Sequence, residues 1–238
     1  LMLNNERIES IAESVEDIVK LPDPVGKTLY ETKRPNGLMI TRVSVPLGVI
    51  GIVYESRPNV TVDASVLCIK AGNVAILRGG SESFKSNACL TKAIQSALIK
   101  NNLNKDIIQF VETTDRVAVD YMLAEMIDTI DVIVPRGGKG LVKKVQDMAK
   151  VPVIGHLEGI CHIYVDKSAN LDTAIKIIHN AKLRRTEICG AAETLLIDEE
   201  YARDNLDTIV TDLHNGGCEV RGDILSKKID DRILLAEE

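Results

Sequence analysis

Residues 47–80 read LGVIGIVYESRPNVTVDASVLCIKAGNVAILRGG, and this stretch decides the fold. Two apolar runs, at 48–54 and 74–78, flank a segment at 62–71 whose apolar residues recur at helical spacing. Because parallel strands need a crossover connection rather than a tight turn, this order indicates a strand, a crossover helix and a second parallel strand. Near-continuous apolar strands further indicate a sheet that is covered on both faces.

The same alternation extends in both directions from this stretch. We predict strands at 38–45, 107–111 and 131–134 and helices at 82–100, 117–126 and 140–149. An amphipathic helix is expected at 5–20, where Pro22 and Pro24 stop it. After Pro152 the pattern changes to strands at 161–165 and 193–197 and helices at 171–181 and 200–214. The sequence therefore predicts an α/β fold with a Rossmann-like doubly wound parallel sheet and a domain boundary near Gly155.

Composition excludes several classes of function. The 238 residues carry a net charge of −6 with a pI of about 5.4, and aromatic residues make up only 3%. The chain lacks the excess positive charge that binds a phosphate backbone and has few aromatic side chains on which bases could stack, so nucleic acid is not an expected partner. The apolar runs are too short to cross a bilayer, and we expect a cytoplasmic protein without membrane contact.

Three predicted strands end in polar junctions, two of them glycine-rich: ESRPN at 55–59, RGGS at 78–81 and PRGGKG at 135–140. Parallel sheets bind ligands at the carboxyl ends of their strands, where glycines let backbone amides approach an anion and arginine offers a planar fork. Glycines that merely turn strands into helices are an equally good reading of any one junction. Three arginines at the same topological position favour a phosphate-bearing ligand. Neither GxGxxG nor GxxxxGK[ST] is present.

The five cysteines are odd in number and widely spaced, which suits neither a disulfide framework nor a zinc site, and no metal is expected. Cys68 and Cys89 lie in predicted helices, where we expect buried thiols. Cys161 and Cys218 lack partner spacing. Cys189 lies in the polar turn RRTEICG at 184–190, where arginine charge would stabilise a thiolate. Chemistry alone leaves a nucleophile and a structural thiol equally open at Cys189.

Several motifs match a known family in order and spacing: PLGVIGIVYESRPNVTVD at 46–63, LRGG at 77–80, IVPRGG at 133–138, GHLEGICH at 155–162 and ICGAAETLL at 188–196. Over residues 23–198 the chain resembles the gamma-glutamyl phosphate reductases, a branch of the aldehyde dehydrogenase superfamily. The resemblance implies NADPH-dependent reduction of L-glutamyl 5-phosphate to L-glutamate 5-semialdehyde and phosphate, in proline biosynthesis. The cysteine that matches Cys189 would attack the acyl phosphate and form a thioester.

The resemblance also implies roles for residues of the polar junctions. Arg57 and Asn59 are the expected substrate-binding residues. The expected NADP-binding residues are Glu55, Arg78, Gly79, Gly80, Ser81, Arg136, Gly137 and Gly138. Ser81 stands where NAD-preferring relatives hold the ribose 2′-hydroxyl with a carboxylate, and its lack of charge leaves room for a 2′-phosphate.

The implied organisation has three parts: an N-terminal helical segment at 1–40 that packs on the cofactor domain, an NADP-binding domain at 41–155, and the first part of an α/β catalytic domain at 156–238. Family members continue beyond both ends, so we expect a fragment with little turnover of its own, from a protein that is a homo-oligomer and uses the product of glutamate 5-kinase.

Two alternatives remain open. The first is a hydrolytic semialdehyde dehydrogenase, although the water-activating glutamate of those enzymes falls on Gly155. The second is a catalytically silent fragment or nucleotide-binding domain.

Overall fold

The computed structural model describes residues 3–155, 159–186 and 188–236. The chain forms two compact units, unit 1 at residues 1–157 and unit 2 at residues 158–238. The predicted boundary near Gly155 lies next to this division. None of the described helices is long and apolar enough to cross a membrane.

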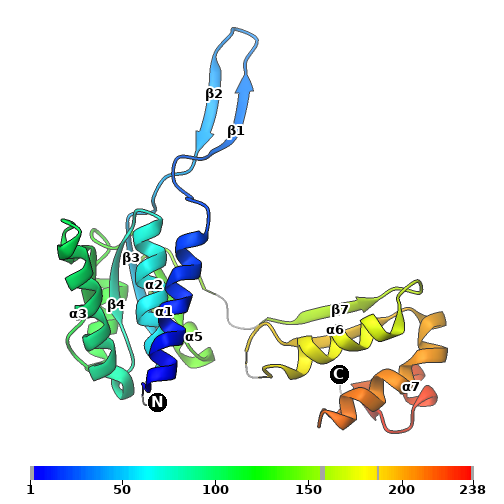
Figure 1. Ribbon diagram of the computed structural model, residues 1–238. Coiled ribbons are helices and arrows are strands. Elements are labelled where there is room, and N and C mark those ends of the chain that lie inside the picture. The colour runs from blue at the N-terminus through cyan, green and yellow to red at the C-terminus, as the bar shows by residue number, and fades with distance from the viewer. Residues whose placement is uncertain (1–2, 156–158, 187, 237–238) are drawn as a thin grey trace. The chain divides into compact units, whose positions relative to one another are not determined.

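Unit 1 contains a four-stranded parallel sheet in the order β5-β4-β3-β6 (Figure 1). Its elements are, in chain order, α1 (Asn5–Lys20), β1 (Thr28–Lys33), β2 (Met39–Val43), β3 (Val49–Tyr54), α2 (Pro58–Lys70), β4 (Val74–Arg78), η1 (Ser81–Ser83), α3 (Phe84–Lys100), η2 (Lys105–Ile107), β5 (Ile108–Phe110), α4 (Val117–Ala124), β6 (Val132–Arg136) and α5 (Lys139–Met148). The chain winds outward from β3 to β5 and then returns to place β6 on the other side of β3. The topological switch point therefore lies between β3 and β6, and the predicted doubly wound sheet is confirmed.

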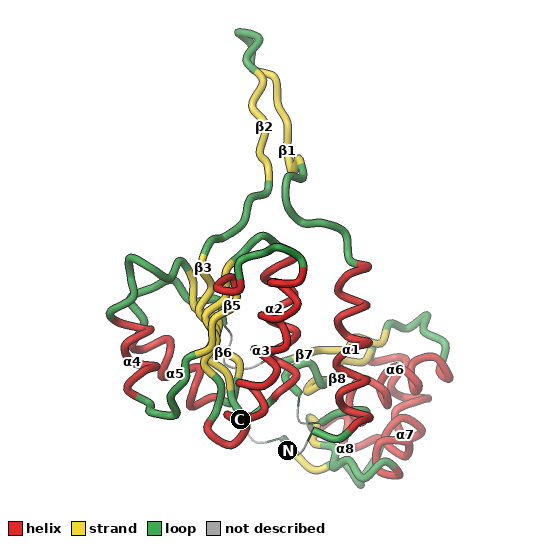
Figure 2. The backbone as a smooth tube through the Cα atoms, turned by 60° about the vertical axis from the view of Figure 1, so that its left-hand side comes forward, coloured by secondary structure: helices red, strands yellow, loops and turns green. Residues whose placement is uncertain are grey.

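Helices cover both faces of this sheet, α2 and α3 on one side and α4 and α5 on the other (Figure 2). One core cluster joins Tyr54 and Leu77 of the strands to Cys68 of α2 and Leu98 of α3. A second cluster joins Val53, Ile76 and Ile133 to α4 and α5. Because successive side chains of a strand point to opposite faces, both faces must be apolar, which explains the unbroken apolar runs in the sequence.

Helix α1 packs on α2. The Ser14 hydroxyl donates to Asp63 at 3.2 Å, and the Lys70 ammonium donates to the Val19 carbonyl at 3.0 Å. The Asn4 side chain caps the helix by accepting the Arg7 N–H. These contacts tie the amphipathic helix to the helical layer on one face of the sheet.

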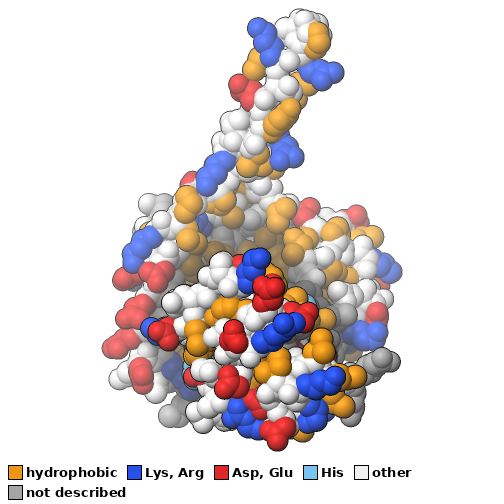
Figure 3. Space-filling model, turned by 90° about the vertical axis from the view of Figure 1, so that its right-hand side faces the viewer, with side chains coloured by type: hydrophobic (Ala, Val, Ile, Leu, Met, Phe, Trp, Pro, Cys, Tyr) orange, Lys and Arg blue, Asp and Glu red, His pale blue; other side chains and the backbone are white. Residues whose placement is uncertain are grey.

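Strands β1 and β2 form an antiparallel hairpin that sequence analysis only half predicted, since residues 28–33 were not assigned to a strand. Both strands are almost wholly exposed, so the apolar alternation that marks a half-buried strand is missing. The turn closes at Gly37, whose φ of +85° favours glycine. Figure 3 shows hydrophobic and cationic side chains side by side along this hairpin.

Unit 2 is built around the parallel strand pair β7–β8. Its elements are β7 (Cys161–Val165), α6 (Leu171–Leu183), β8 (Ala192–Ile197), α7 (Glu199–Asn215), β9 (Arg221–Gly222), α8 (Ile224–Ile229) and β10 (Leu234–Leu235). Helices α6 and α7 cover one face of the pair, in a core cluster that includes Val165, Ile178 and Ile209. On the other face, Tyr164 is 61% exposed and Leu196 is 50% exposed.

Candidate functional site

Unit 1 has a cavity of about 600 Å³ at the carboxyl ends of its parallel strands. Its lining comes from the last residues of β3 and β4 and from the segments that follow β3, β4, β5 and β6: Val53, Tyr54, Glu55, Ser56, Arg57, Arg78, Gly80, Ser81, Glu82, Thr114, Arg116, Val119, Gly140, Leu141 and Lys144. Open α/β sheets bind ligands at this edge, next to the switch point. The position and the mixture of cationic and apolar lining fit a cofactor with phosphate groups.

The junctions after β3 and β6 are joined by a carboxylate. Glu55 accepts the Gly138 N–H at 3.0 Å, and Gly138 is the N-cap of α5. A Cβ atom at Gly137 would lie 2.6 Å from the carboxyl carbon of Glu55, so glycine is required for this approach. The N-terminus of a helix favours an anion, and here it already holds one from the chain itself. A phosphate that binds at α5 must therefore share this end with Glu55.

The glycines after β4 are explained by packing within the protein. A Cβ atom at Gly79 would collide with the amide of Asn87 and lie 3.0 Å from the ring of Tyr54. At Gly80 it would lie 2.8 Å from the Ser56 hydroxyl oxygen. These glycines let the end of β4 lie against the end of β3. Only Gly80 also borders the cavity.

Arg78 is the most constrained of the predicted residues, since only 8% of it is exposed. Its Nη1 donates to the Gly79 carbonyl at 3.0 Å, and its Nη2 donates to the carbonyls of Thr114 and Asp115 at 2.9 and 3.1 Å. Burial, with a contribution from the nearby charge of Arg116, lowers the pKa of Arg78. Its Nε is buried and has no hydrogen-bond partner among the described atoms. Such an orphaned donor favours a ligand that accepts a hydrogen bond.

The remaining predicted residues divide into two groups. Arg57, the residue before α2, and Ser81, the first residue of η1, line the cavity together with Glu55, Arg78 and Gly80. The lining does not include Gly79, Arg136, Gly137, Gly138 or Asn59, all of which are described residues. The Asn59 amide instead donates to Asp63 at 3.1 Å along α2.

Sequence analysis missed the contribution of the segment after β5, which supplies Thr114 and Arg116. The segment ETTDR at 112–116 contains no glycine and lies outside every motif that carries the family resemblance. The carboxyl-end rule alone would have included this junction. Lys144 of α5 was also missed, and its ammonium is paired with Asp120 at 2.6 Å.

In unit 2, Cys189 is exposed and lies in the turn before β8. The Cys161 thiol donates to the Cys189 carbonyl at 3.5 Å, which places the turn against the start of β7. A Cβ atom at Gly159 would collide with the same carbonyl. The turn backbone is thus held, while the Cys189 residue stays exposed. Residues 156–158 of the family motif GHLEGICH lie outside the described residues.

One of the expectations about the other cysteines is wrong. Cys68 is buried, and burial raises its pKa to about 11. Cys89, predicted to be buried, is exposed. Helix α3 turns Asn87, Thr91 and Leu98 toward the core, and at about 100° per residue Cys89 points away from them. An apolar neighbour in the sequence was therefore a poor guide to the buried face.

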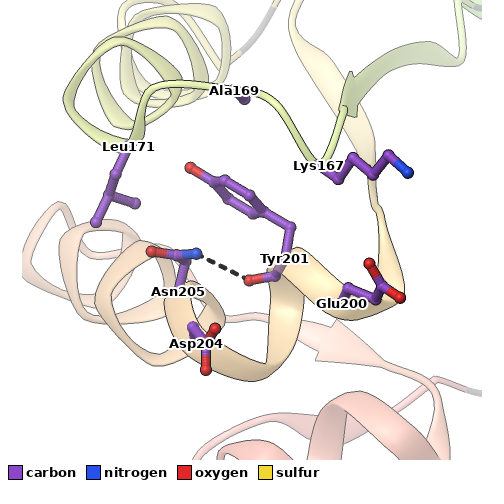
Figure 4. A pocket seen from close by; sticks show the side chains of 7 residues that line it. All are labelled: Lys167, Ala169, Leu171, Glu200, Tyr201, Asp204 and Asn205. Atoms are coloured by element: carbon purple, nitrogen blue, oxygen red, sulfur yellow. Dashed lines mark hydrogen bonds between the residues drawn. The ribbon is translucent and has the colours of Figure 1, made fainter.

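Unit 2 also has a hollow of about 480 Å³ beyond the carboxyl end of β7, bordered by the start of α7 (Figure 4). Its lining residues are Lys167, Ala169, Leu171, Glu200, Tyr201, Asp204 and Asn205. Parallel strands share one direction, so the turn before β8 and the loop after β7 lie at opposite ends of the pair. This hollow and Cys189 are consequently separate features.

Comparisons with known proteins agree with this description. A sequence profile described as the aldehyde dehydrogenase family matches residues 4–217. A gamma-glutamyl phosphate reductase from Parvibaculum lavamentivorans is 56% identical over the whole chain, and one from Brucella suis biovar 1 is 59% identical over 93% of it. The matches cover 56% and 53% of those two proteins, so the chain spans about half the length of the curated relatives it matches.

Solved structures show the same similarity. A gamma-glutamyl phosphate reductase from Thermotoga maritima is 42% identical, with a TM-score of 0.89 over 100% of this chain and 57% of its own. The corresponding protein from Saccharomyces cerevisiae is 31% identical, with a TM-score of 0.58 over 97% of this chain and 57% of its own.

Proposed function

The chain belongs to the aldehyde dehydrogenase family, and we propose on this premise that it is part of an NADPH-dependent gamma-glutamyl phosphate reductase. The resemblance found in the sequence is confirmed by two gamma-glutamyl phosphate reductases that are more than 50% identical to the chain. The proposed reaction converts L-glutamyl 5-phosphate to L-glutamate 5-semialdehyde and phosphate. Glutamate 5-kinase is the enzyme we expect to supply the acyl phosphate, in the cytoplasm.

The fit of unit 1 to the cofactor supports the proposal. The buried Nε of Arg78 has no hydrogen-bond partner among the described atoms, and Arg116 makes no ion pair with a described carboxylate. Ser81 adds a hydroxyl at the same cavity. These are donors for phosphate or ribose oxygens, and a cavity of about 600 Å³ lies within the usual range for ligand sites. When bound, NADPH would supply the hydride for the reaction.

The single observation that carries the catalytic part is the exposure of Cys189 within the family motif ICGAAETLL. We propose that its thiolate attacks the acyl carbon of glutamyl phosphate, forming a carbon–sulfur bond while the carbon–oxygen bond to phosphate breaks. The products of this step are phosphate and a cysteinyl thioester. Hydride addition to that thioester, followed by expulsion of the thiolate, gives the aldehyde and restores Cys189.

Because the chain spans about half of its relatives' length, the two partial reactions test the proposal more sharply than turnover does. We expect NADPH to bind to the chain. We also expect glutamyl phosphate, made in place by glutamate 5-kinase and ATP, to add one glutamyl group to Cys189, which mass spectrometry of the digested protein would detect.

Cys189→Ser is the matched control for the acylation, since it keeps the shape and removes the thiol. Loss of the glutamyl label in this variant, with NADPH binding unchanged, is the expected result. Labelling that moved to Cys161 or persisted in Cys189→Ser would contradict the assignment. The Thermotoga maritima protein, assayed for phosphate-dependent reduction of NADP by glutamate semialdehyde, provides a positive control. Reduction that did not need phosphate would favour the hydrolytic alternative.

A further inference from the structure

Two arginines that border the cavity of unit 1, Arg78 and Arg116, differ in how their guanidinium groups are bonded. Arg78 has its guanidinium bonded to three main-chain carbonyls, and two of these belong to the loop between β5 and α4. A guanidinium has five N–H groups, so most of its fork is already in use. Arg78 therefore holds the end of β4 to the loop at Thr114–Asp115 and cannot offer a phosphate a bidentate contact without releasing that loop.

Arg116 lies at the end of the loop that Arg78 holds. It is the N-cap of α4, it is exposed, and it lines the same cavity as Arg78 and Ser81. No carboxylate in the described part of the chain forms an ion pair with it, whereas Lys144 of α5, which also lines the cavity, is paired with Asp120 of α4. The guanidinium group of Arg116 is thus available to a ligand in the cavity.

The two arginines are close enough to interact. The charge of Arg116 helps to lower the pKa of Arg78, although burial is the larger cause and Asp115 opposes the shift. Two guanidinium groups near each other raise the local positive potential, which an anion relieves. A dianionic phosphate monoester gains more from this pair than a neutral hydroxyl does.

The place of Arg116 in the sheet indicates which phosphate it meets. In doubly wound sheets a dinucleotide lies across the switch point with its pyrophosphate at a helix N-terminus, here between β3 and β6. The end of β5 is three strands from β6 in the order β5-β4-β3-β6, or about 14 Å at about 4.8 Å per strand. That distance reaches the adenosine end of the dinucleotide rather than its pyrophosphate.

We propose that Arg116 selects the phosphorylated dinucleotide by binding its 2′-phosphate, and that Arg78 is a positioning residue that fixes the loop carrying Arg116. This inference rests on the proposed function, in that the cavity must hold a nicotinamide dinucleotide. It adds to the expected NADP-binding residues one that lies outside every predicted junction.

Direct binding to the 238-residue chain tests the proposal without turnover. Calorimetric titrations would compare NADPH with NADH, and 2′,5′-ADP with 5′-AMP, for the unchanged chain and for Arg116→Ala. We expect Arg116→Ala to weaken binding of NADPH and 2′,5′-ADP by about ten- to a hundredfold, as loss of a charged hydrogen bond does. Binding of NADH and 5′-AMP should change by less than about threefold. Arg116→Lys should keep part of the preference, because it keeps the charge but loses the fork.

Arg42→Ala is the control, since it removes an exposed arginine that lies in the β1–β2 hairpin and does not line the cavity. It should leave the ratio of NADPH to NADH affinity unchanged. An unchanged ratio in Arg116→Ala, or an equal loss for both dinucleotides, would overturn the inference while leaving the proposed function intact. Failure of the unchanged chain to bind either dinucleotide would instead overturn the proposed function of the cavity and the inference with it.

Discussion

The four-stranded sheet of unit 1 and the β7–β8 pair of unit 2 differ in how much of each is covered. In unit 1 the central strands β3 and β4 are buried along almost their whole length, with helices on both faces. In unit 2 the β7–β8 pair is covered on one face, and Tyr164 and Leu196 remain exposed on the other. Packing therefore fixes the positions of the site side chains in unit 1, as the three hydrogen bonds from Arg78 to main-chain carbonyls illustrate. The candidate nucleophile of unit 2 lies in a turn whose backbone accepts a hydrogen bond from the Cys161 thiol at the start of β7.

The largest expected difference between the units is in thiol reactivity. Cys68 is buried in the core of unit 1 with its pKa raised to about 11, whereas Cys189 of unit 2 is exposed. The raised pKa alone lowers the thiolate fraction of Cys68 at neutral pH about a hundredfold, compared with a thiol whose pKa is 9.0. Burial also hinders access of the reagent and slows the reaction further. Alkylation with iodoacetamide, followed by peptide mass spectrometry, should label Cys189 at least about a hundredfold faster than Cys68. Cys89 controls for unit 1, since it is exposed and should react. Comparable rates at Cys68 and Cys189 would contradict the contrast.

Core truncation should show the same contrast in stability. Leu77 is fully buried in the sheet of unit 1, and Leu77→Ala should lower the free energy of unfolding of that unit by about 2–5 kcal/mol. Leu196→Ala, in the half-open sheet of unit 2, should cost no more than about 0.5 kcal/mol. Because the units are separate, hydrogen exchange of amides in β3 and in β8 is a better measure than one melting curve. A larger loss at Leu196 would mean that the open face is covered in solution.

The same difference explains how far the sequence could predict the structure. The runs that become β3, β4 and β6 are apolar on both faces, so strand positions and the doubly wound sheet followed directly from the pattern. The hairpin strand β1 has no buried face, and without burial no periodicity marks it. Cys89 was misjudged because its immediate neighbours do not determine which way a helix turns.

Site prediction was limited in a similar way. The polar junctions after the predicted strands identified the correct edge of the sheet and five residues that border the cavity: Glu55, Arg57, Arg78, Gly80 and Ser81. They could not reveal that the Arg78 fork is used by the Thr114–Asp115 loop, because those contacts join residues distant in the sequence. Arg116 was missed because its segment, ETTDR at 112–116, has no glycine and belongs to none of the motifs that match the family.

Raising the pH above 10 should lower the free energy of unfolding of unit 1 in particular. Burial raises the pKa of Tyr54 from 10.0 to about 12, and its hydrogen bond with Thr61 opposes only part of this shift. A raised folded-state pKa means that the stabilisation is complete below pH 10 and is lost as the pH rises toward 12. We expect unit 1 to lose about 2–3 kcal/mol across this window, in addition to a loss from Cys68 that starts near pH 9.

Tyr54→Phe tests the assignment of the alkaline loss. This variant removes the titrating hydroxyl, so the loss between pH 10 and 12 should shrink even though the contact with Thr61 is gone. Amides of α7 in unit 2 serve as the internal reference. An alkaline loss of unchanged size in Tyr54→Phe would show that another group controls it.

The smallest effect is expected at the acid end and in unit 2. Asp230 is buried beside Arg232, with an Nη2–Oδ2 distance of 2.6 Å, and the hydrogen bond from Arg232 lowers the pKa of Asp230 below 3.8. A lowered folded-state pKa gives stabilisation that is present above the unfolded value and is lost as the pH falls through the folded value. Asp230→Asn should therefore cost up to about 1 kcal/mol at pH 7, since Arg232 is partly exposed and its charge is screened by water.

The difference in stability between Asp230→Asn and the unchanged protein should shrink as the pH falls well below 3.8. The opening free energies of α7 amides in hydrogen exchange measure this difference. Amides of β3 should not respond, because Asp230 lies in unit 2, and a response there would mean that the two units do not unfold independently.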